Sequence, residues 1–430
     1  MALLLLVVLV VLCCLVAGGA EAEVAWDRWG ALHINATDAS SQPVLVNGVD
    51  VVRSLESIAA EQQAQQALLS QAAQTLSAQR STLDMQEGAL PLVENAACAT
   101  IRPSRSFTIQ GATGFATQLR WLGAVVGADG LIYGIPAEAT SVLIINATTN
   151  TVDVTSIAGL PTAPYKWTNG VLAPSNGAIY AFPNRFDAVL KIDPSTGSTD
   201  FTTMAGLGTT SYGKWESGAL AHNGLIYAIP QGATSVLIIN PNNDSIDTTT
   251  IAGLGSSLEK WWGAAVAADG RIFSIPRAAS SVLIVDPETN TADITSIAGV
   301  PAFGDSTKQW LGTVLSASGR VVVGIPFTAD ADVMLVDTET FQVSFIEVPR
   351  STAGRRWIGG VLADNGRIFA FPFDEASVLV VDVDAGWVDT TSVVVGPGVA
   401  QYAGGVLGSS GFIYAVPHNS DTVLVVNPAC

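Results

Sequence analysis

Hydrophobic positions in residues 121–430 fall into short runs of strand length, separated by turns rich in Gly, Asn, Asp and Pro. One representative block contains four such runs, at 263–267, 271–276, 281–286 and 292–298. The runs are rich in β-branched and aromatic residues, which favour strands, and none has helical periodicity. We therefore predict four short strands in this block.

The turns between these runs predict antiparallel pairing. Asp269-Gly270 joins the first two runs, and such dipeptides suit a tight hairpin because Gly, Asn and Asp tolerate positive φ. Asp286-Pro287 joins the third and fourth runs, where Pro presets a turn and ends the pairing. Each block is thus expected to form a four-stranded antiparallel sheet.

The block recurs seven times, and an aromatic residue marks the start of each copy. These anchor residues are 45 to 49 positions apart: Trp121, Trp167, Trp215, Trp261, Trp310, Trp357 and Tyr402. A four-stranded unit at this period is typical of a propeller blade. The seventh copy stops after three strands, and residues 106–111 resemble the missing fourth. We predict an all-β, seven-bladed propeller over residues 98–430, with this N-terminal strand closing the last blade.

Residues 47–91 have a different pattern, which predicts a helical stalk. Five leucines share one seven-residue grid, at Leu55, Leu69, Leu76, Leu83 and Leu90. Such a seam predicts a long coiled-coil α-helix that makes the protein a homo-oligomer through residues 51–90. The alternative is a single helix lying against its own propeller. Residues 23–46 have no clear pattern.

Residues 2–17 are uninterrupted and apolar, and small residues suited to cleavage follow. We interpret residues 1–22 as a secretory signal peptide, with an uncleaved membrane anchor as the alternative. The formal charge of −18 opposes binding to nucleic acid or to an anionic membrane through bulk charge. In a secreted chain, Cys98 and Cys430 are expected to form a disulfide, the alternatives being free thiols or bonds between chains. Possible glycosylation sites are Asn35, Asn146 and Asn243.

Basic residues recur immediately before the anchors, on the face where the second-to-third strand loops are expected. The residues at this position are Arg120, Lys166, Lys214, Lys260, Gln309, Arg356 and Gln401. The loops of the same face add Arg185, Arg277 and His418. One interpretation is a basic ring that binds an anionic glycan. The other is structural, with the tryptophans wedged between blades and the lysines extended over them.

Sequence signatures of an enzyme are sparse. His33, His222 and His418 are the three histidines, which leaves little material for a histidine-based metal or acid–base site. There is no nucleophile motif, phosphate-binding glycine loop or cysteine–histidine metal spacing. We therefore expect neither a cofactor nor a resident metal and favour a protein without catalytic activity.

The block consensus, K-W-x-G-G-V-L-A-x-N-G-x-I-Y-A-I-P followed by S-V-L-I-I-D-P, resembles a repeat of uncharacterised propeller proteins of algae and other protists. The double glycines Gly359-Gly360 and Gly404-Gly405 are similar to those of kelch repeats. Similarity to streptogramin-lyase-like and gluconolactonase-like propellers is weaker, because their catalytic histidine and metal carboxylates have no matching motif here. The resemblance implies the fold and no particular activity.

Together these features predict a secreted, multivalent binding protein whose ligand is an extracellular glycan or protein. A propeller lyase or lactonase with a site in the channel is one alternative. A structural component of a matrix or cell wall is another.

Overall fold

The structure, a computed structural model, describes residues 105–111, 120–300 and 309–428, together with short segments between residues 22 and 71. The chain divides into two compact units, residues 1–92 and residues 93–430. The signal peptide up to residue 21, most of the predicted coiled coil, Cys98 and Cys430 lie outside the described residues.

The described part of the first unit contains two small antiparallel pairs. Strand β1 (Ala22–Trp26) pairs with β2 (Leu32–Ala36), and β3 (Leu45–Val46) pairs with β4 (Val49–Asp50). Asn35 lies in β2, opposite Glu23. The described residues between 63 and 71 are helical. None of the helices among the described residues has the length and apolar character needed to cross a membrane.

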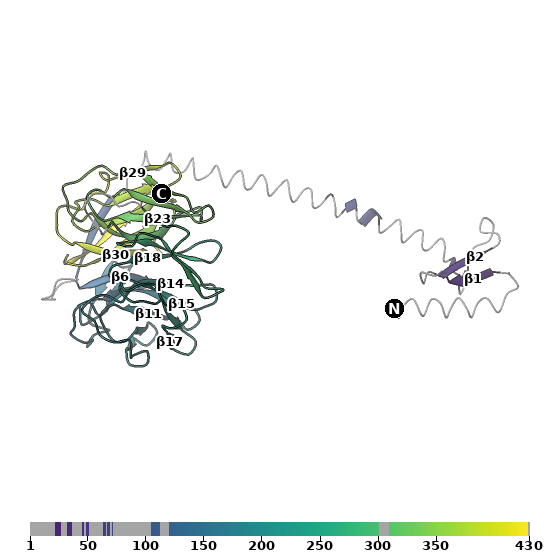
Figure 1. The fold of residues 1–430 in the computed structure, drawn as a ribbon, viewed down its shortest axis with the longest axis horizontal. Helices are drawn as coiled ribbons and strands as arrows, with labels where there is room; N and C mark the ends of the chain where they lie inside the picture. The colour runs from purple at the N-terminus through teal and green to yellow at the C-terminus, as the bar shows by residue number, and fades with distance from the viewer. Residues whose placement is uncertain are drawn as a thin grey trace. The chain divides into compact units, whose positions relative to one another are not determined.

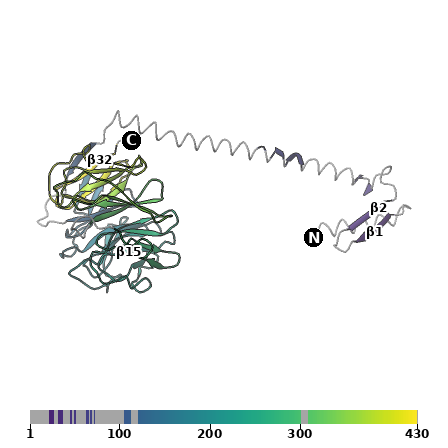
Figure 2. The ribbon, with the colours of Figure 1, turned by 45° about the horizontal axis from the view of Figure 1, so that its top comes forward.

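The second unit contains seven four-stranded antiparallel sheets, the blades (Figures 1 and 2). Blades 1 to 3 are β6 (Trp121–Val126), β7 (Ile132–Pro136), β8 (Leu143–Asn146) and β9 (Thr151–Asp153); β10 (Trp167–Ala173), β11 (Ala178–Pro183), β12 (Leu190–Asp193) and β13 (Ser198–Asp200); β14 (Trp215–Leu220), β15 (Ile226–Pro230), β16 (Leu237–Asn240) and β17 (Ser245–Asp247). Blade 4 is β18 (Trp261–Val266), β19 (Ile272–Pro276), β20 (Leu283–Asp286) and β21 (Thr291–Asp293).

Blades 5 and 6 are β22 (Trp310–Leu315), β23 (Val321–Pro326), β24 (Val333–Asp337) and β25 (Val343–Ile346); β26 (Trp357–Leu362), β27 (Ile368–Pro372), β28 (Leu379–Asp382) and β29 (Trp387–Asp389). Blade 7 has the order β30 (Tyr402–Leu407), β31 (Ile413–Pro417), β32 (Thr422–Asn427) and β5 (Arg105–Gln110). Its outer strand therefore comes from the start of the unit, and it pairs from Thr422 opposite Gln110 to Asn427 opposite Arg105. The prediction of a seven-bladed all-β propeller is confirmed.

The fourth strands are shorter than the sequence predicted. In blade 4 we expected strand over 292–298, but β21 ends at Asp293. The carboxylate of Asp293 accepts hydrogen bonds from the backbone N–H groups of Thr295 and Ser296, which turns the chain out of the sheet. A single bridge between Ser281 and Ala298 then resumes the pairing. An Asp side chain thus ends the strand although the residues after it favour β structure.

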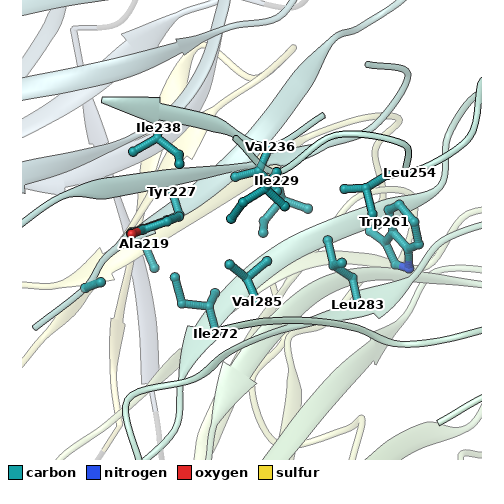
Figure 3. Close-up of a cluster of buried hydrophobic side chains, with 12 residues drawn as sticks. Ala219, Tyr227, Ile229, Val236, Ile238, Leu254, Trp261, Ile272, Leu283 and Val285 are labelled. Atoms are coloured by element: carbon teal, nitrogen blue, oxygen red, sulfur yellow. The ribbon is translucent and has the colours of Figure 1, made fainter. Parts of the chain in front are cut away.

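Hydrophobic cores lie between neighbouring blades, and this arrangement explains the repeated tryptophan. Figure 3 shows the cluster between blades 3 and 4, where Trp261 packs with Leu254 and Leu283. The indole Nε1 of Trp261 donates to the carbonyl of Ser281 at 2.7 Å, and Trp121, Trp167, Trp215, Trp310 and Trp357 make the equivalent bond. Blades 7 and 1 share a cluster of the same kind, which includes Ile109 of β5. The anchors are therefore packing wedges between blades.

The innermost strands approach so closely at the centre of the ring that their third position favours glycine. A Cβ built on Gly404 would lie 2.9 Å from the Cα of Gly123 in the neighbouring blade. A Cβ on Gly359 would lie 3.1 Å from the Cα of Gly404. Both residues also have positive φ, at 81° and 68°. Backbone packing therefore narrows the channel below its mouth.

Candidate functional site

A cavity of about 560 Å³ opens on the face formed by the second-to-third strand loops. We call it the mouth cavity. Three repeat positions supply most of its lining. The first position lies two residues before the anchor and is occupied by Tyr165, Gly213, Glu259, Arg355 and Ala400. The second lies one residue after the anchor and is occupied by Leu122, Glu216, Trp262, Leu311 and Ile358. The third follows the proline that ends the second strand and is occupied by Asn184, Gln231, Arg277, Phe327, Phe373 and His418.

Blades 2 to 4 form the polar side of the mouth cavity. Glu216 is 4% exposed, and the side-chain amide of Asn184 donates a hydrogen bond to its Oε1. Burial raises the pKa of the Glu216 carboxyl to about 7, although the positive charge of Arg277 acts in the opposite direction. Arg277 forms an ion pair with Glu259 at 3.1 Å. This side therefore carries charges of both signs in a confined space.

Two arginines on this side stack on aromatic rings. The guanidinium carbon of Arg185 lies 4.3 Å from the centre of the Tyr165 ring. The guanidinium carbon of Arg277 lies 4.9 Å from the Trp262 ring. Stacking fixes a planar guanidinium while leaving its edge for an acid group. The polar side therefore presents its cations in defined orientations.

Blades 5 to 7 form the apolar side. Leu311, Phe327, Ile358 and Phe373 belong to one buried cluster, in which the Phe327 and Phe373 rings are 5.7 Å apart. His418 packs beside Phe373 at 5.4 Å. Burial lowers the pKa of His418 to about 4, so its imidazole is neutral at pH 7. This side therefore offers apolar and aromatic surface, with the neutral His418 and the ion-paired Arg355 at its edge.

Four residues that line the cavity each have one buried polar atom without a hydrogen-bond partner among the described residues. The atoms are Arg185 Nε, Glu216 Oε2, Thr328 Oγ1 and His418 Nδ1. Buried polar atoms are nearly always paired in folded proteins, so each such exception calls for an explanation. Each of these four atoms is almost completely buried, so it lies behind the surface of the cavity.

The predicted basic ring has a different location from the cavity. Lys166, Lys214 and Lys260 are at most 6% exposed, and their ammonium groups donate to loop carbonyls of the preceding blade. Lys166 Nζ lies 2.9 Å from the carbonyl oxygen of Ala139, Lys260 Nζ lies 2.8 Å from that of Ala233, and Lys214 Nζ lies 2.6 Å from that of Phe186. Burial lowers the pKa of each of these lysines to about 8.

The two arginines of the basic ring are also buried between loops. Arg120 pairs with Asp421 at 2.7 Å, and Arg356 pairs with Glu375 at 2.8 Å. The structure therefore brings Arg185, Arg277 and His418 together in the mouth cavity and places the five ring residues behind its wall. This geometry favours the structural interpretation of the repeated cations.

Sequence reasoning missed Glu216, Asn184, Tyr165, Glu259, Trp262 and Arg355. The signal lay in the repeat itself, because the three lining positions vary from blade to blade, whereas the aromatic anchor and the proline that ends the second strand are nearly constant. Glu216 stands where other blades have Leu, Thr, Trp, Ile or Ala. Among the residues that the structure describes, no group of three His, Cys, Asp or Glu side chains is arranged to hold a metal ion.

The predicted glycosylation sites in the propeller lie away from the mouth. Asn146 ends β8 and its side-chain oxygen accepts from the backbone N–H of Thr148 at 2.9 Å. Asn243 is exposed in the turn between β16 and β17. Both belong to third-to-fourth strand corners, as the repeat predicted.

Neither a protein-family model nor a curated protein sequence matches the chain. Solved structures match it in fold. Streptogramin B lyase has a TM-score of 0.59 at 11% identity, over 76% of this chain and 98% of that one. A catalytically inactive histidine-to-alanine variant of virginiamycin B lyase from Staphylococcus aureus, solved with quinupristin, gives 0.59 at 11%, over 75% and 99%.

The extracellular domain of a candidate one-component system from B. thetaiotaomicron gives a TM-score of 0.52 at 10% identity, over 75% of this chain and 39% of that one. At these identities the likeness concerns the fold alone. The chain therefore has a streptogramin-lyase-like seven-bladed propeller fold, which proteins of different function share.

Proposed function

We propose that the protein is a secreted binding protein whose mouth cavity takes an acidic sugar unit. The observation that carries the proposal is the pair of arginines that line the cavity, Arg185 and Arg277, whose guanidinium groups stack on Tyr165 and Trp262. A stacked guanidinium keeps its edge for a carboxylate, and the polar side chains around it can pair with the hydroxyl groups of one small ring.

The apolar side and the size of the cavity support the same class of ligand. Phe327 and Phe373, together with Trp262 of the polar side, line the cavity with apolar surface that can contact the C–H groups of a sugar ring. A volume of about 560 Å³ lies in the range of small-ligand sites and leaves room for one or two sugar units. Neutral sugars offer these arginines no carboxylate, so we expect a preference for uronic acids.

Calorimetric titration with galacturonic acid, and with galactose as the neutral counterpart, tests this proposal. Arg185→Gln is expected to weaken binding of galacturonic acid about 30-fold and to leave galactose unaffected. The matched control is Arg271→Gln. Arg271 also stacks on an aromatic ring, 5.2 Å from Phe273, but it belongs to the opposite face. Absence of binding, or equal effects of the two variants, would contradict the proposal.

A lyase is the second candidate, because Glu216 is a cavity carboxyl with a pKa near neutrality. In such a reaction the ionised carboxylate accepts the proton from the carbon beside the sugar carboxylate. A C=C bond forms as the C–O bond to the neighbouring sugar breaks, and the leaving oxygen takes up a proton. Ultraviolet absorbance of the unsaturated product during incubation with polygalacturonic acid, lost in Glu216→Gln, would favour this function over binding alone.

We propose further that residues 47–91 form a coiled-coil stalk that displays several propellers and so increases avidity for a polymeric ligand. Closure of the ring by β5, reinforced by a Cys98–Cys430 disulfide, belongs to the same proposal. Sedimentation of the full chain as an oligomer, and of residues 98–430 as a monomer, is expected. Mass spectrometry without reduction should find the two cysteines linked in one peptide pair.

A further inference from the structure

The three arginines that line the mouth cavity differ in their acidic partners. Arg277 forms an ion pair with Glu259 at 3.1 Å, and Arg355 forms one with Asp374 at 2.8 Å. Arg185 stacks on an aromatic ring, and among the described residues no carboxylate forms an ion pair with it. Its charge is therefore the one best placed to take the carboxylate of an acidic ligand.

Glu216 is a carboxyl group on the same side of the cavity, and within the described part of the chain it also has no ion pair. The residue is 4% exposed, and its Oε1 accepts a hydrogen bond from the side-chain amide of Asn184. An amide is a neutral partner and does not compensate a negative charge. Because Glu216 is almost completely buried, it acts on a ligand through its charge, which little water screens there.

Charged and titratable groups surround Glu216 on several elements. Those that line the same cavity are Tyr165 and Arg185 of blade 2, Glu259 and Arg277 of blade 4, and Arg355 and His418 on the other side. Lys214 precedes Glu216 on the innermost strand of blade 3, but its ammonium group donates to the carbonyls of Phe186 and Gly208 in the wall. Glu138 of blade 1 interacts with Arg185 through charge, without an ion pair between them.

Within this set Glu216 changes its charge near neutral pH. Burial raises the pKa of its carboxyl to about 7, against the opposing effect of Arg277. Burial lowers the pKa of His418 to about 4 and raises the pKa of the Tyr165 hydroxyl, so both stay neutral at pH 7. Burial lowers the pKa of Lys214 to about 8, so that lysine loses its charge at higher pH than Glu216 gains one.

We propose that Glu216 controls binding at the mouth cavity, which holds an acidic ligand while Glu216 is neutral and releases it when Glu216 is ionised. This inference rests on the proposed function, because it requires a ligand carboxylate at Arg185. An ionised Glu216 places a second negative charge near that carboxylate in a poorly screened site. Binding of the ligand and binding of the proton therefore favour each other, and the coupling is reciprocal. The protein takes up acidic sugars in acidic surroundings and releases them above neutral pH.

Calorimetric titration of the full chain with galacturonic acid at pH 6 and at pH 8 tests this control. The sugar carboxyl is ionised at both pH values, so a change in affinity comes from the protein. Affinity is expected to be about tenfold lower at pH 8, because only about a tenth of the Glu216 carboxyls carry a proton there. Titrations at pH 8 in two buffers of different ionisation enthalpy should show that about one proton is taken up with each ligand.

Two variants assign the effect to one carboxyl. Glu216→Gln removes the titrating group, so it should bind galacturonic acid equally well at pH 6 and pH 8 and take up no proton. Glu259→Gln is the matched control, because it removes a negative charge from the same cavity lining, but one that is held in an ion pair with Arg277. This variant should keep the tenfold pH dependence and the proton uptake, whatever its affinity. Both variants retain Lys214, so any pH effect of that lysine remains in each of them.

The outcomes separate this inference from the proposed function. If galacturonic acid binds in an Arg185-dependent manner with the same affinity at both pH values, the mouth cavity is a binding site and control by Glu216 is overturned. If the pH dependence and the proton uptake persist in Glu216→Gln, another group is responsible and the inference is equally overturned. If the sugar binds at neither pH, both proposals are overturned. A pH dependence and proton uptake that Glu216→Gln alone abolishes support the inference.

Discussion

Two sets of charged side chains surround the mouth of the propeller, and they differ in their relation to the repeat. Lys166, Lys214 and Lys260 recur at one repeat position, and their ammonium groups meet loop carbonyls between blades. Glu216 and Arg185 stand at positions that vary from blade to blade, and both line the cavity. The comparison teaches that recurrent charges hold the architecture, whereas charges at variable positions line the cavity.

The largest difference in the free energy of unfolding is expected between variants of two adjacent arginines, of which only Arg356 belongs to the basic ring. Arg356 is 2% exposed and pairs with Glu375, whereas Arg355 is 47% exposed and pairs with Asp374, both at 2.8 Å. Removing one partner of a buried pair leaves an uncompensated charge, so Arg356→Met should lower the free energy of unfolding by about 4 kcal/mol. Arg355→Met should cost about 1 kcal/mol or less, because exposed pairs contribute little.

Denaturant titration at pH 7 measures both variants. Arg355 is a matched control for Arg356. It has the same charge, it also stacks on an aromatic ring, and its partner Asp374 is next in sequence to Glu375, the partner of Arg356. Equal losses of unfolding free energy in the two variants would show that recurrence and burial do not identify the charged residues that stabilise the fold.

A second prediction concerns Glu216, whose charge should destabilise the fold. Its pKa is about 7 in the folded protein against an ordinary value of 4.5. Between these values the folded protein retains a proton that the unfolded chain releases, so stability falls as pH rises through this window. At pH 8 Glu216→Gln should therefore be more stable than the natural protein by about 3 kcal/mol, from 1.36 kcal/mol for each pKa unit.

The size of the effect of Glu216→Gln depends on pH, which provides an internal control. At pH 4 the carboxyl is protonated in both folded and unfolded states, and the two proteins should unfold with nearly the same free energy. The difference in unfolding free energy between the two proteins should grow between pH 4.5 and pH 7 and stay nearly constant above pH 7. A difference that does not change with pH would mean that Glu216 acts through packing and not through its charge.

The fold could be predicted from the sequence because each structural feature of the blade recurs in seven copies. The aromatic anchors, the Gly-containing hairpins and the proline that ends the second strand mark the blade at every copy. The strand ends were less predictable. The carboxylate of Asp293 accepts a hydrogen bond from the backbone N–H of Thr295 and so turns the chain out of β21. Strand propensity does not predict where a side chain competes in this way with strand pairing.

The site was only partly predictable, because a basic residue in the sequence does not reveal where its charge points. Arg185, Arg277 and His418 follow the second strands and do line the cavity. The lysines one residue before the anchors point into the wall, whereas residues two before and one after the anchors line the cavity. A shift of one position along an innermost strand changes the face that a side chain occupies. Variation between blades, more than charge, was the usable signal.

The smallest effect that we predict compares two glycines with nearly the same backbone conformation. Gly404 has φ 81° and Gly159 has φ 83°, so alanine at either position costs about 1 kcal/mol through left-handed backbone strain. At Gly159 an added Cβ meets nothing within 4 Å, whereas at Gly404 it would meet the Cα of Gly123 at 2.9 Å. We therefore expect Gly404→Ala to lose about 2 kcal/mol and Gly159→Ala about 1 kcal/mol.

The difference between these variants isolates the close approach of blades 7 and 1, since the strain is common to both. Thermal unfolding, followed by circular dichroism, can resolve a difference of this size. If the two variants lose equal stability, backbone conformation alone explains glycine at this repeat position, and the packing of the innermost strands does not require it.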